Sequence, residues 1–202
     1  MKEMNNRVFR KVNSIFDFML LNILWILASI PIITIFPATA AMFGVVRKKV
    51  LDREINGICR LFFDLFKENF RVSFVLFTIW MGIATFIYID YIFLGIPTPL
   101  FQLGYKILLF IGTLLFLAIS MYIFPIMVHF DLNWRYVLKN SVFLALINPI
   151  VTMISILIFS ISMYLVYTFP VSIFFISSFT SFSIYYLCQL VFNRLTPWNE
   201  TN

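Results

Sequence analysis

The sequence predicts an all-α, polytopic membrane protein with about six membrane-embedded helices and one cytoplasmic amphipathic helix. The chain of 202 residues is 62% hydrophobic and only 12% charged, whereas soluble domains carry about 25% charged residues. Its long uncharged stretches are comparable in helical length to a hydrocarbon core of about 30 Å. These stretches are residues 18–46, 72–89, 107–128 and 140–193. We therefore expect a single membrane domain over residues 1–202.

The distribution of basic residues predicts the topology. If residues 18–46 enter the membrane and return, the basic N-terminus, residues 47–71, residues 129–140 and the C-terminal tail share one side. Of the 15 Lys and Arg residues, only Lys106 then lies on the other side. Because cytoplasmic loops are enriched in Lys and Arg, we expect both termini in the cytoplasm of a bacterial plasma membrane. A single crossing would place residues 47–71 opposite the basic N-terminus and is disfavoured.

Two prolines interrupt the first uncharged stretch. Each lacks a backbone donor and resists continuation of the preceding helix. The stretch is too long for one upright helix and short for two, so we predict a broken hairpin over residues 12–51, with helices at 12–30 and 37–51. The break is either a tight turn at the outer surface or a re-entrant turn whose free carbonyls face a polar cavity. Its candidate structural and functional residues are Pro31, Thr34, Pro37 and Thr39.

The remaining spans follow from the other uncharged stretches. The Phe169-Pro170 step divides the last stretch into two. The predicted spans are residues 72–89, 107–128, 141–168 and 171–192. Residues 90–106 form an outer loop, for which Tyr91 and Tyr105 are aromatic anchors in the membrane interface.

Residues 57–71 have the pattern of an amphipathic helix, with apolar residues at helical spacing and charged residues on the other side. One interpretation is a helix lying on the inner leaflet near anionic lipid. The other is a docking helix for a cytoplasmic partner or an adjacent permease. The candidate partner or lipid surface is Phe62, Phe66, Lys67 and Phe70.

Residues with catalytic chemistry are sparse. The single histidine, His129, lies at a span boundary, and the acidic residues Asp17 and Asp90 lie at span ends. No nucleotide-binding loop, zinc-protease motif or nucleophile elbow is present. The serines and threonine of residues 177–183 suit helix packing, or a polar lining for a sugar-like solute. We therefore expect no enzyme activity, no cofactor and no metal. We also expect no nucleic-acid partner, because the basic residues flank apolar spans, as the positive-inside topology explains.

Several of these elements together resemble the YesL-like family of bacterial integral membrane proteins, a domain of unknown function. The most specific element is Pro31 followed by Pro37-Ala38-Thr39-Ala40-Ala41 and then Val46-Arg47-Lys48. Others are Phe63-x-x-Phe66-Lys67-x-Asn69-Phe70, Pro125 shortly before His129, and Leu138-Lys139-Asn140. The cytoplasmic boundary residues among them are Arg47, Lys48, Pro125, Lys139 and Asn140.

The resemblance implies a companion of carbohydrate ABC importers and sugar-responsive regulators. We therefore expect a non-enzymatic accessory to carbohydrate import, with membrane lipids and an ABC permease or regulatory membrane protein as partners. Two alternatives remain open: a small solute transporter or channel that uses the broken hairpin, and a membrane sensor coupled to a cytoplasmic regulator.

Overall fold

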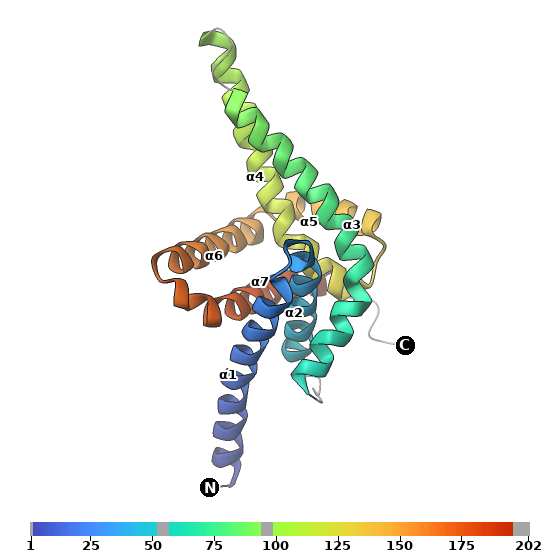
Figure 1. Ribbon diagram of the computed structural model, residues 1–202, viewed down its shortest axis with the longest axis vertical. Coiled ribbons are helices and arrows are strands. Elements are labelled where there is room, and N and C mark those ends of the chain that lie inside the picture. The colour runs from blue at the N-terminus through green and yellow to red at the C-terminus, as the bar shows by residue number, and fades with distance from the viewer. Residues whose placement is uncertain (1, 52–56, 94–98, 196–202) are drawn as a thin grey trace.

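The protein is helical throughout the part of the chain that its computed structural model describes, residues 2–51, 57–93 and 99–195. The prediction of an all-α protein is confirmed. In Figure 1, α3 and α4 run together away from the rest of the protein, α1 extends the opposite way, and α6 and α7 form a hairpin at the side. The elements are α1 (Lys2–Ser29), η1 (Ile32–Thr34), α2 (Ile35–Val50), α3 (Ile58–Phe93), α4 (Pro99–Phe130), α5 (Trp134–Ile147), α6 (Pro149–Thr168), η2 (Pro170–Ser172) and α7 (Ile173–Leu195).

Four helical segments are long and apolar enough to cross a membrane, which supports a polytopic membrane protein. They are Ile58–Ile92, Leu103–Phe130, Pro149–Thr168 and Pro170–Arg194, and a shorter apolar helix covers Phe16–Ser29. In the most apolar 18-residue stretch of each of the four segments, only 11–33% is buried inside the protein. So much exposed apolar surface suits contact with lipid.

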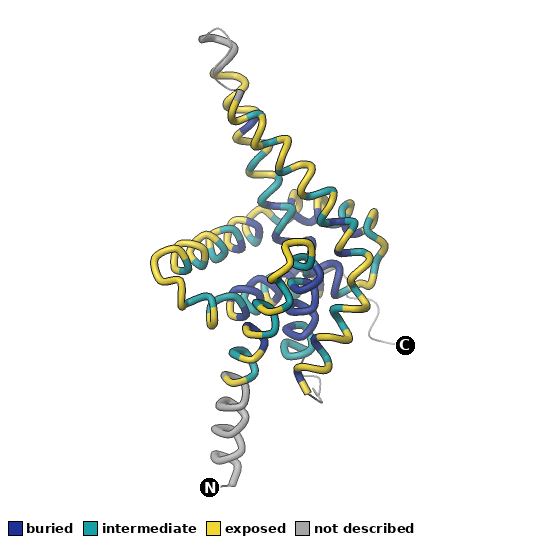
Figure 2. The backbone as a smooth tube through the Cα atoms, in the orientation of Figure 1, coloured by how far each residue is buried: buried dark blue, intermediate teal, exposed yellow. Residues whose placement is uncertain are grey.

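Helix α2 lies at the centre of the core. Nine of its residues are buried, among them Ala38, Ala40 and Ala41, and Figure 2 shows this buried segment between its neighbours. Small residues allow helices to approach closely: a Cβ atom added at Gly44 would lie 2.8 Å from Cδ1 of Leu65 on α3. The run of small residues after Pro37 therefore positions α2 among α1, α3, α4 and α7.

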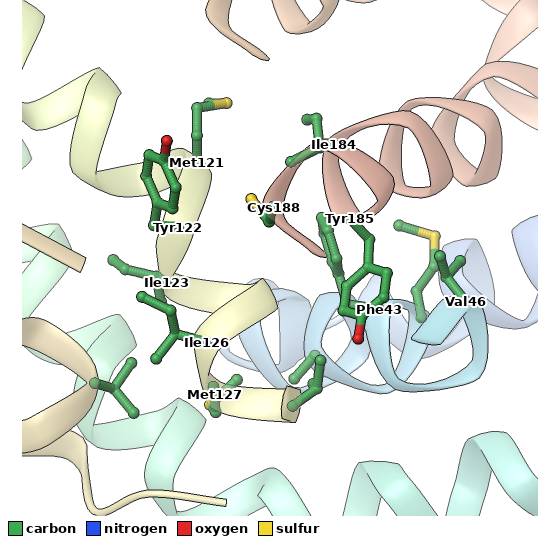
Figure 3. Packing of buried hydrophobic residues seen from close by; sticks show 14 of the residues in the cluster. Phe43, Val46, Met121, Tyr122, Ile123, Ile126, Met127, Ile184, Tyr185 and Cys188 are labelled. Atoms are coloured by element: carbon green, nitrogen blue, oxygen red, sulfur yellow. The ribbon is translucent and has the colours of Figure 1, made fainter. Parts of the chain in front are cut away.

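The rest of the core forms where α4 and α7 meet α2 (Figure 3). Tyr122 and Ile126 of α4 are fully buried, as are Tyr185 and Cys188 of α7. Phe43 of α2 stacks on Phe124 of α4, with ring centroids 5.7 Å apart. The core therefore joins segments from both ends of the sequence.

The predicted division between an amphipathic helix at residues 57–71 and a span at 72–89 is wrong. Both belong to the continuous helix α3. No glycine or proline occurs in α3 before Gly82, so no helix-breaking residue separates the two segments. Charged side chains such as Lys67 and Glu68 end the apolar pattern without ending the helix.

The predicted span 141–168 is divided. Helix α5 ends at Ile147 and α6 begins at Pro149, because proline disfavours the helical conformation of the residue before it. Asn148 accordingly has φ −117° and ψ 64°. Helix α5 (Trp134–Ile147) thus combines part of the predicted loop 129–140 with the first residues of the predicted span.

Other boundaries also differ from the prediction. Helix α1 begins at Lys2 instead of residue 12, and α2 begins at Ile35 instead of Pro37. The predicted loop 90–106 is shorter, since α3 continues to Phe93 and α4 starts at Pro99. Residues 94–98 of that loop lie outside the described part of the chain.

Candidate functional site

Thr34 provides hydrogen bonds to two backbone carbonyls at the break between α1 and α2. The hydroxyl of Thr34 lies 2.6 Å from the carbonyl oxygens of both Ala28 and Pro31, and the Thr34 N–H also donates to the Pro31 oxygen at 2.9 Å. A single hydroxyl proton serves one of the two carbonyls at a time. Pro37 is buried in the first turn of α2, where a backbone N–H has no partner within the helix. The break therefore centres on residues 30–34, and Pro37 belongs to the start of the next helix.

The two arms of the hairpin are held in antiparallel register. Lys49 forms an ion pair with Asp17 at 2.8 Å, and the indole N–H of Trp25 donates to the Thr39 hydroxyl at 3.1 Å. Between the ion pair and the break, each arm has twelve apolar or uncharged residues, 18–29 and 35–46. Twelve helical residues extend about 18 Å, little more than half of a hydrocarbon core of about 30 Å.

The break lies part-way along the longer α3/α4 hairpin. The Phe36 ring, just after the break, is 5.5 Å from the Phe77 ring of α3 and 5.1 Å from the Phe124 ring of α4. Asp90 is thirteen residues further along α3 than Phe77, about 20 Å at 1.5 Å per residue. Figure 1 shows α3 and α4 continuing beyond the α1/α2 hairpin.

A cavity of about 520 Å³ adjoins the break. Ile35, Phe36 and Thr39 form part of its wall. Ile32 and Ile33 instead lie on the surface of the protein, where they are 67% and 53% exposed. The wall is predominantly apolar, so the polar cavity predicted for a re-entrant break is not what the break faces. The other wall residues come from α1, α2, α3, α4, α6 and α7 and include Trp25, Met42, Trp80, Ser120, Phe124, Phe159, Ser162, Met163, Val166, Ser177, Thr180 and Ser181.

The hydroxyl groups in this wall are engaged within the protein. Ser120 donates to the Phe116 carbonyl and accepts from the Trp80 indole at 3.0 Å. Thr180 lies 2.6 Å from the Ser162 hydroxyl. Each of Thr39, Ser162, Ser177, Thr180 and Ser181 is also bonded to a backbone carbonyl four residues earlier. Every hydroxyl and indole N–H of the described wall thus already has a protein acceptor.

A buried amide near the cavity was not identified from the sequence. Asn22 is fully buried; its amide donates to the Phe174 carbonyl, and its oxygen accepts from the Ser178 N–H and hydroxyl, all at 2.8 Å. It joins α1 to α7 and so connects the broken hairpin to the last span. The available signal was an amide within an uncharged stretch, since a polar residue inside a membrane usually has a partner on another helix.

The predicted partner or lipid surface is only partly exposed. Phe62 is fully buried in the core and Phe66 is partly buried against it, so Phe62 cannot contact a partner. Lys67 is exposed, and Phe70 is 39% exposed. Phe63 and Phe74, which are 48% and 43% exposed, lie seven residues before and four after Phe70. Helical spacing places these three on one face, which we call the α3 aromatic face (Phe63, Phe70 and Phe74).

The predicted boundary residues take different positions. Arg47 at the end of α2 donates from Nη1 to the Val128 carbonyl of α4 at 2.6 Å, and Pro125 is buried in the last turns of α4. The ends of α2 and α4 therefore meet. Lys48 and Asn140 are partly buried and Lys139 is exposed. Lys139 borders a second, polar depression with Asn133, Trp134 and Arg135 at the start of α5.

The segment that contains the broken hairpin and most of α3 is shared with other proteins. The family model described as "Protein of unknown function, DUF624" matches residues 18–91. Over 138 residues the chain is 35% identical to "Uncharacterized protein YesL" of Bacillus subtilis (strain 168). The aligned region covers 66% of this chain and 64% of that protein. The chain belongs to the YesL-like family.

Two further Bacillus subtilis (strain 168) proteins are similar. "Uncharacterized protein YteU" is 31% identical over 142 residues, 69% of this chain and 64% of that protein. "Uncharacterized protein YesV" is 26% identical over 153 residues, 74% of each. The YesL-like chain thus spans slightly under two thirds of the length of YesL and YteU. No solved structure matches it.

Proposed function

We propose that this YesL-like protein is a non-enzymatic accessory subunit of the bacterial plasma membrane that binds another membrane protein. Its partner class is a carbohydrate ABC importer, and this part of the proposal comes from the resemblance described above. The observation that carries the accessory role is the α3 aromatic face.

The α3 aromatic face has a rigid support. The same helical segment contributes Ile58 and Phe62 to the core, where they are 7% and 0% exposed. Burying one apolar face is enough to hold an amphipathic helix in place. This segment has a second apolar face, the α3 aromatic face, which the core does not cover. Exposed aromatic side chains on a fixed support are typical of the centres of protein interfaces, because they contribute a large contact area with little loss of conformational freedom.

A transporter of sugar-like solutes is less well supported. Such a solute carries many hydroxyl groups, and a site that recognises it needs donors and acceptors that are free to bind it. The hydroxyl and indole donors in the wall of the cavity are already bonded within the protein. The accessory role needs no such free groups.

The test is co-purification from the native membrane in mild detergent. The double variant Phe63→Ser/Phe70→Ser should recover an ABC permease, identified by mass spectrometry, at a several-fold lower yield than the parent. The matched control is Tyr136→Ser, which removes an aromatic side chain that is 59% exposed on α5. Equal recovery with the double variant and the parent would show that the α3 aromatic face contacts lipid only.

A second measurement addresses the carbohydrate part of the proposal. Deletion of the protein should lower the uptake of the sugar carried by the importer that co-purifies, and the Phe63→Ser/Phe70→Ser variant should restore uptake less than the parent does. Unchanged uptake after deletion would contradict a role in carbohydrate import.

A further inference from the structure

We infer that the cavity beside the broken hairpin holds an acyl chain of a membrane phospholipid. This inference requires a membrane location but does not rest on the accessory function. Three observations support it: the chemistry of the wall, the depth of the cavity along α3, and the continuity of the wall with the exposed apolar surface.

The wall suits a hydrocarbon chain. The donors that it contains are bonded to protein acceptors, as in the Trp25–Thr39 and Trp80–Ser120 pairs, and a hydrocarbon chain needs none. The volume of about 520 Å³ is in the range of sites for small organic ligands, about 300–1,000 Å³. Apolar cavities stay dry and bind apolar molecules, so water is a poor occupant.

The cavity lies at the depth of lipid tails. Trp80 in its wall is nine residues from Arg71 and ten from Asp90 along α3. The whole interval from Arg71 to Asp90 extends about 28 Å, close to the thickness of a hydrocarbon core. Because each arm of the α1/α2 hairpin extends only about 18 Å, Ile35 and Phe36 reach the same middle region. The short hairpin therefore leaves apolar space beside α3 and α4 at the centre of the bilayer.

The wall continues onto the outside of the protein. Met163 of α6 belongs to the wall and is 56% exposed. Its neighbours on the outer surface include Tyr164, which is 67% exposed. An acyl chain in the surrounding bilayer therefore has an apolar path into the cavity, and the described wall residues include no charged side chain to displace.

The experiment uses the full-length protein in vesicles of phosphatidylethanolamine and phosphatidylglycerol. A small fraction of the lipid is a phospholipid with a photoreactive diazirine at the middle of one acyl chain. After illumination, the labelled positions are mapped by mass spectrometry. We expect label on wall residues such as Met163 and Phe159, as well as on lipid-facing residues such as Leu108, which is 67% exposed.

Two variants on α7 form a matched pair. Ser177 lies in the wall and Ser183 does not, and each hydroxyl bonds the carbonyl four residues earlier. Ser177→Phe fills the cavity and should lower labelling of Phe159 several-fold relative to Leu108, whereas Ser183→Phe should leave that ratio unchanged. If Ser177→Phe does not fold, Val166→Trp in the wall and Leu165→Trp beside it provide the same comparison from α6.

Several outcomes would overturn the inference. In one, Phe159 remains unlabelled while Leu108 is labelled in the parent protein. In another, the variants that fill the cavity, Ser177→Phe and Val166→Trp, label Phe159 relative to Leu108 in the same ratio as the parent protein. In a third, illumination in native membranes cross-links the wall to another protein and not to lipid, in which case a partner's side chains occupy the cavity.

Discussion

Helix α2 of the first hairpin and the outer part of the α3/α4 hairpin are both apolar, yet they have opposite environments. In the α1/α2 hairpin, Ala38 and Ala41 are completely buried, whereas Phe86 and Leu108 in the outer part of the α3/α4 hairpin are 66% and 67% exposed. Hydrophobicity does not distinguish the two, because lipid is as apolar as a protein core. Residue size does: small side chains permit close helix packing, and bulky ones suit lipid.

Polar side chains that bond across helices mark the packed parts of both hairpins. In the first, Asn22 and Trp25 bond to other helices. In the second, Trp80 of α3 bonds to Ser120 of α4 beside the cavity, whereas Thr78 and Thr113 bond only to carbonyls four residues earlier in their own helix. A hydrogen bond between helices specifies a neighbour, while a bond within one helix only satisfies the hydroxyl. The packed part of this membrane protein is therefore marked by small residues together with polar groups that bond across helices.

The largest expected effect is an all-or-none difference in labelling from outside the cell. In a Cys59→Ser/Cys188→Ala background, a membrane-impermeant maleimide should label Tyr91→Cys at the end of α3 and not Ile33→Cys at the break. The arms of the first hairpin are too short to reach the outer surface while those of the second are not. Equal labelling of the two positions in intact cells would place the break at the outer surface.

The next effect concerns packing, with a glycine in each hairpin. A side chain at Gly44 would collide with Leu65, whereas a Cβ atom at Gly82 has nothing within 4 Å. Gly44→Leu should lower stability by about 1–3 kcal/mol, the usual cost of overpacking, and Gly82→Leu should not. Thermal unfolding in detergent measures both, and equal losses would contradict the assignment of the two environments.

A smaller loss is expected for Asn22→Leu. The change removes three hydrogen bonds between α1 and α7. Hydrogen bonds between membrane helices contribute about 0.6 kcal/mol each on average in double-mutant cycles, so the expected total loss is about 1–2 kcal/mol. Thr78→Val is the control, because its hydroxyl bonds only to Phe74 of the same helix. If Asn22→Leu unfolds at the temperature of the control, the amide does not hold α1 against α7.

The smallest effect is expected for Thr34→Val, which removes the hydroxyl that lies against the Ala28 and Pro31 carbonyls. Losing one such bond costs about 1 kcal/mol. Thr168→Val removes an exposed hydroxyl bonded to Tyr164 and serves as the reference. A loss no greater than that of the reference would show that water satisfies these carbonyls.

Much of the secondary structure could be predicted from local patterns. The apolar stretches at residues 72–89 and 107–128 lie within single helices, and the Phe169-Pro170 step separates α6 from α7. The predictions were wrong where a signal was given the wrong meaning. The change from charged to uncharged residues after Arg71 was read as a helix boundary, although α3 continues through it, and the division before Pro149 was missed.

The candidate site was harder to predict than the helices. Thr34 and Thr39 were identified because they lie beside prolines, but Trp25, Trp80, Ser120 and Ser162 carry no local signal that distinguishes them from other span residues. They form one wall only because six helices converge there. Likewise, the spacing of Phe62 and Phe63 on α3 does not reveal that Phe62 is fully buried and Phe63 is 48% exposed.

The sequence by itself determined that the protein is helical and membrane-embedded, and where its first hairpin breaks. Length, apolar composition and proline act through the backbone within a few residues, so they are readable along the chain. Only the tertiary structure decided which apolar residues face protein, which face lipid, and that the short hairpin adjoins a cavity. These properties arise from packing between distant segments, as in the contact of Asn22 with Ser178, and lipid and protein interior are too similar in polarity for the sequence to separate them.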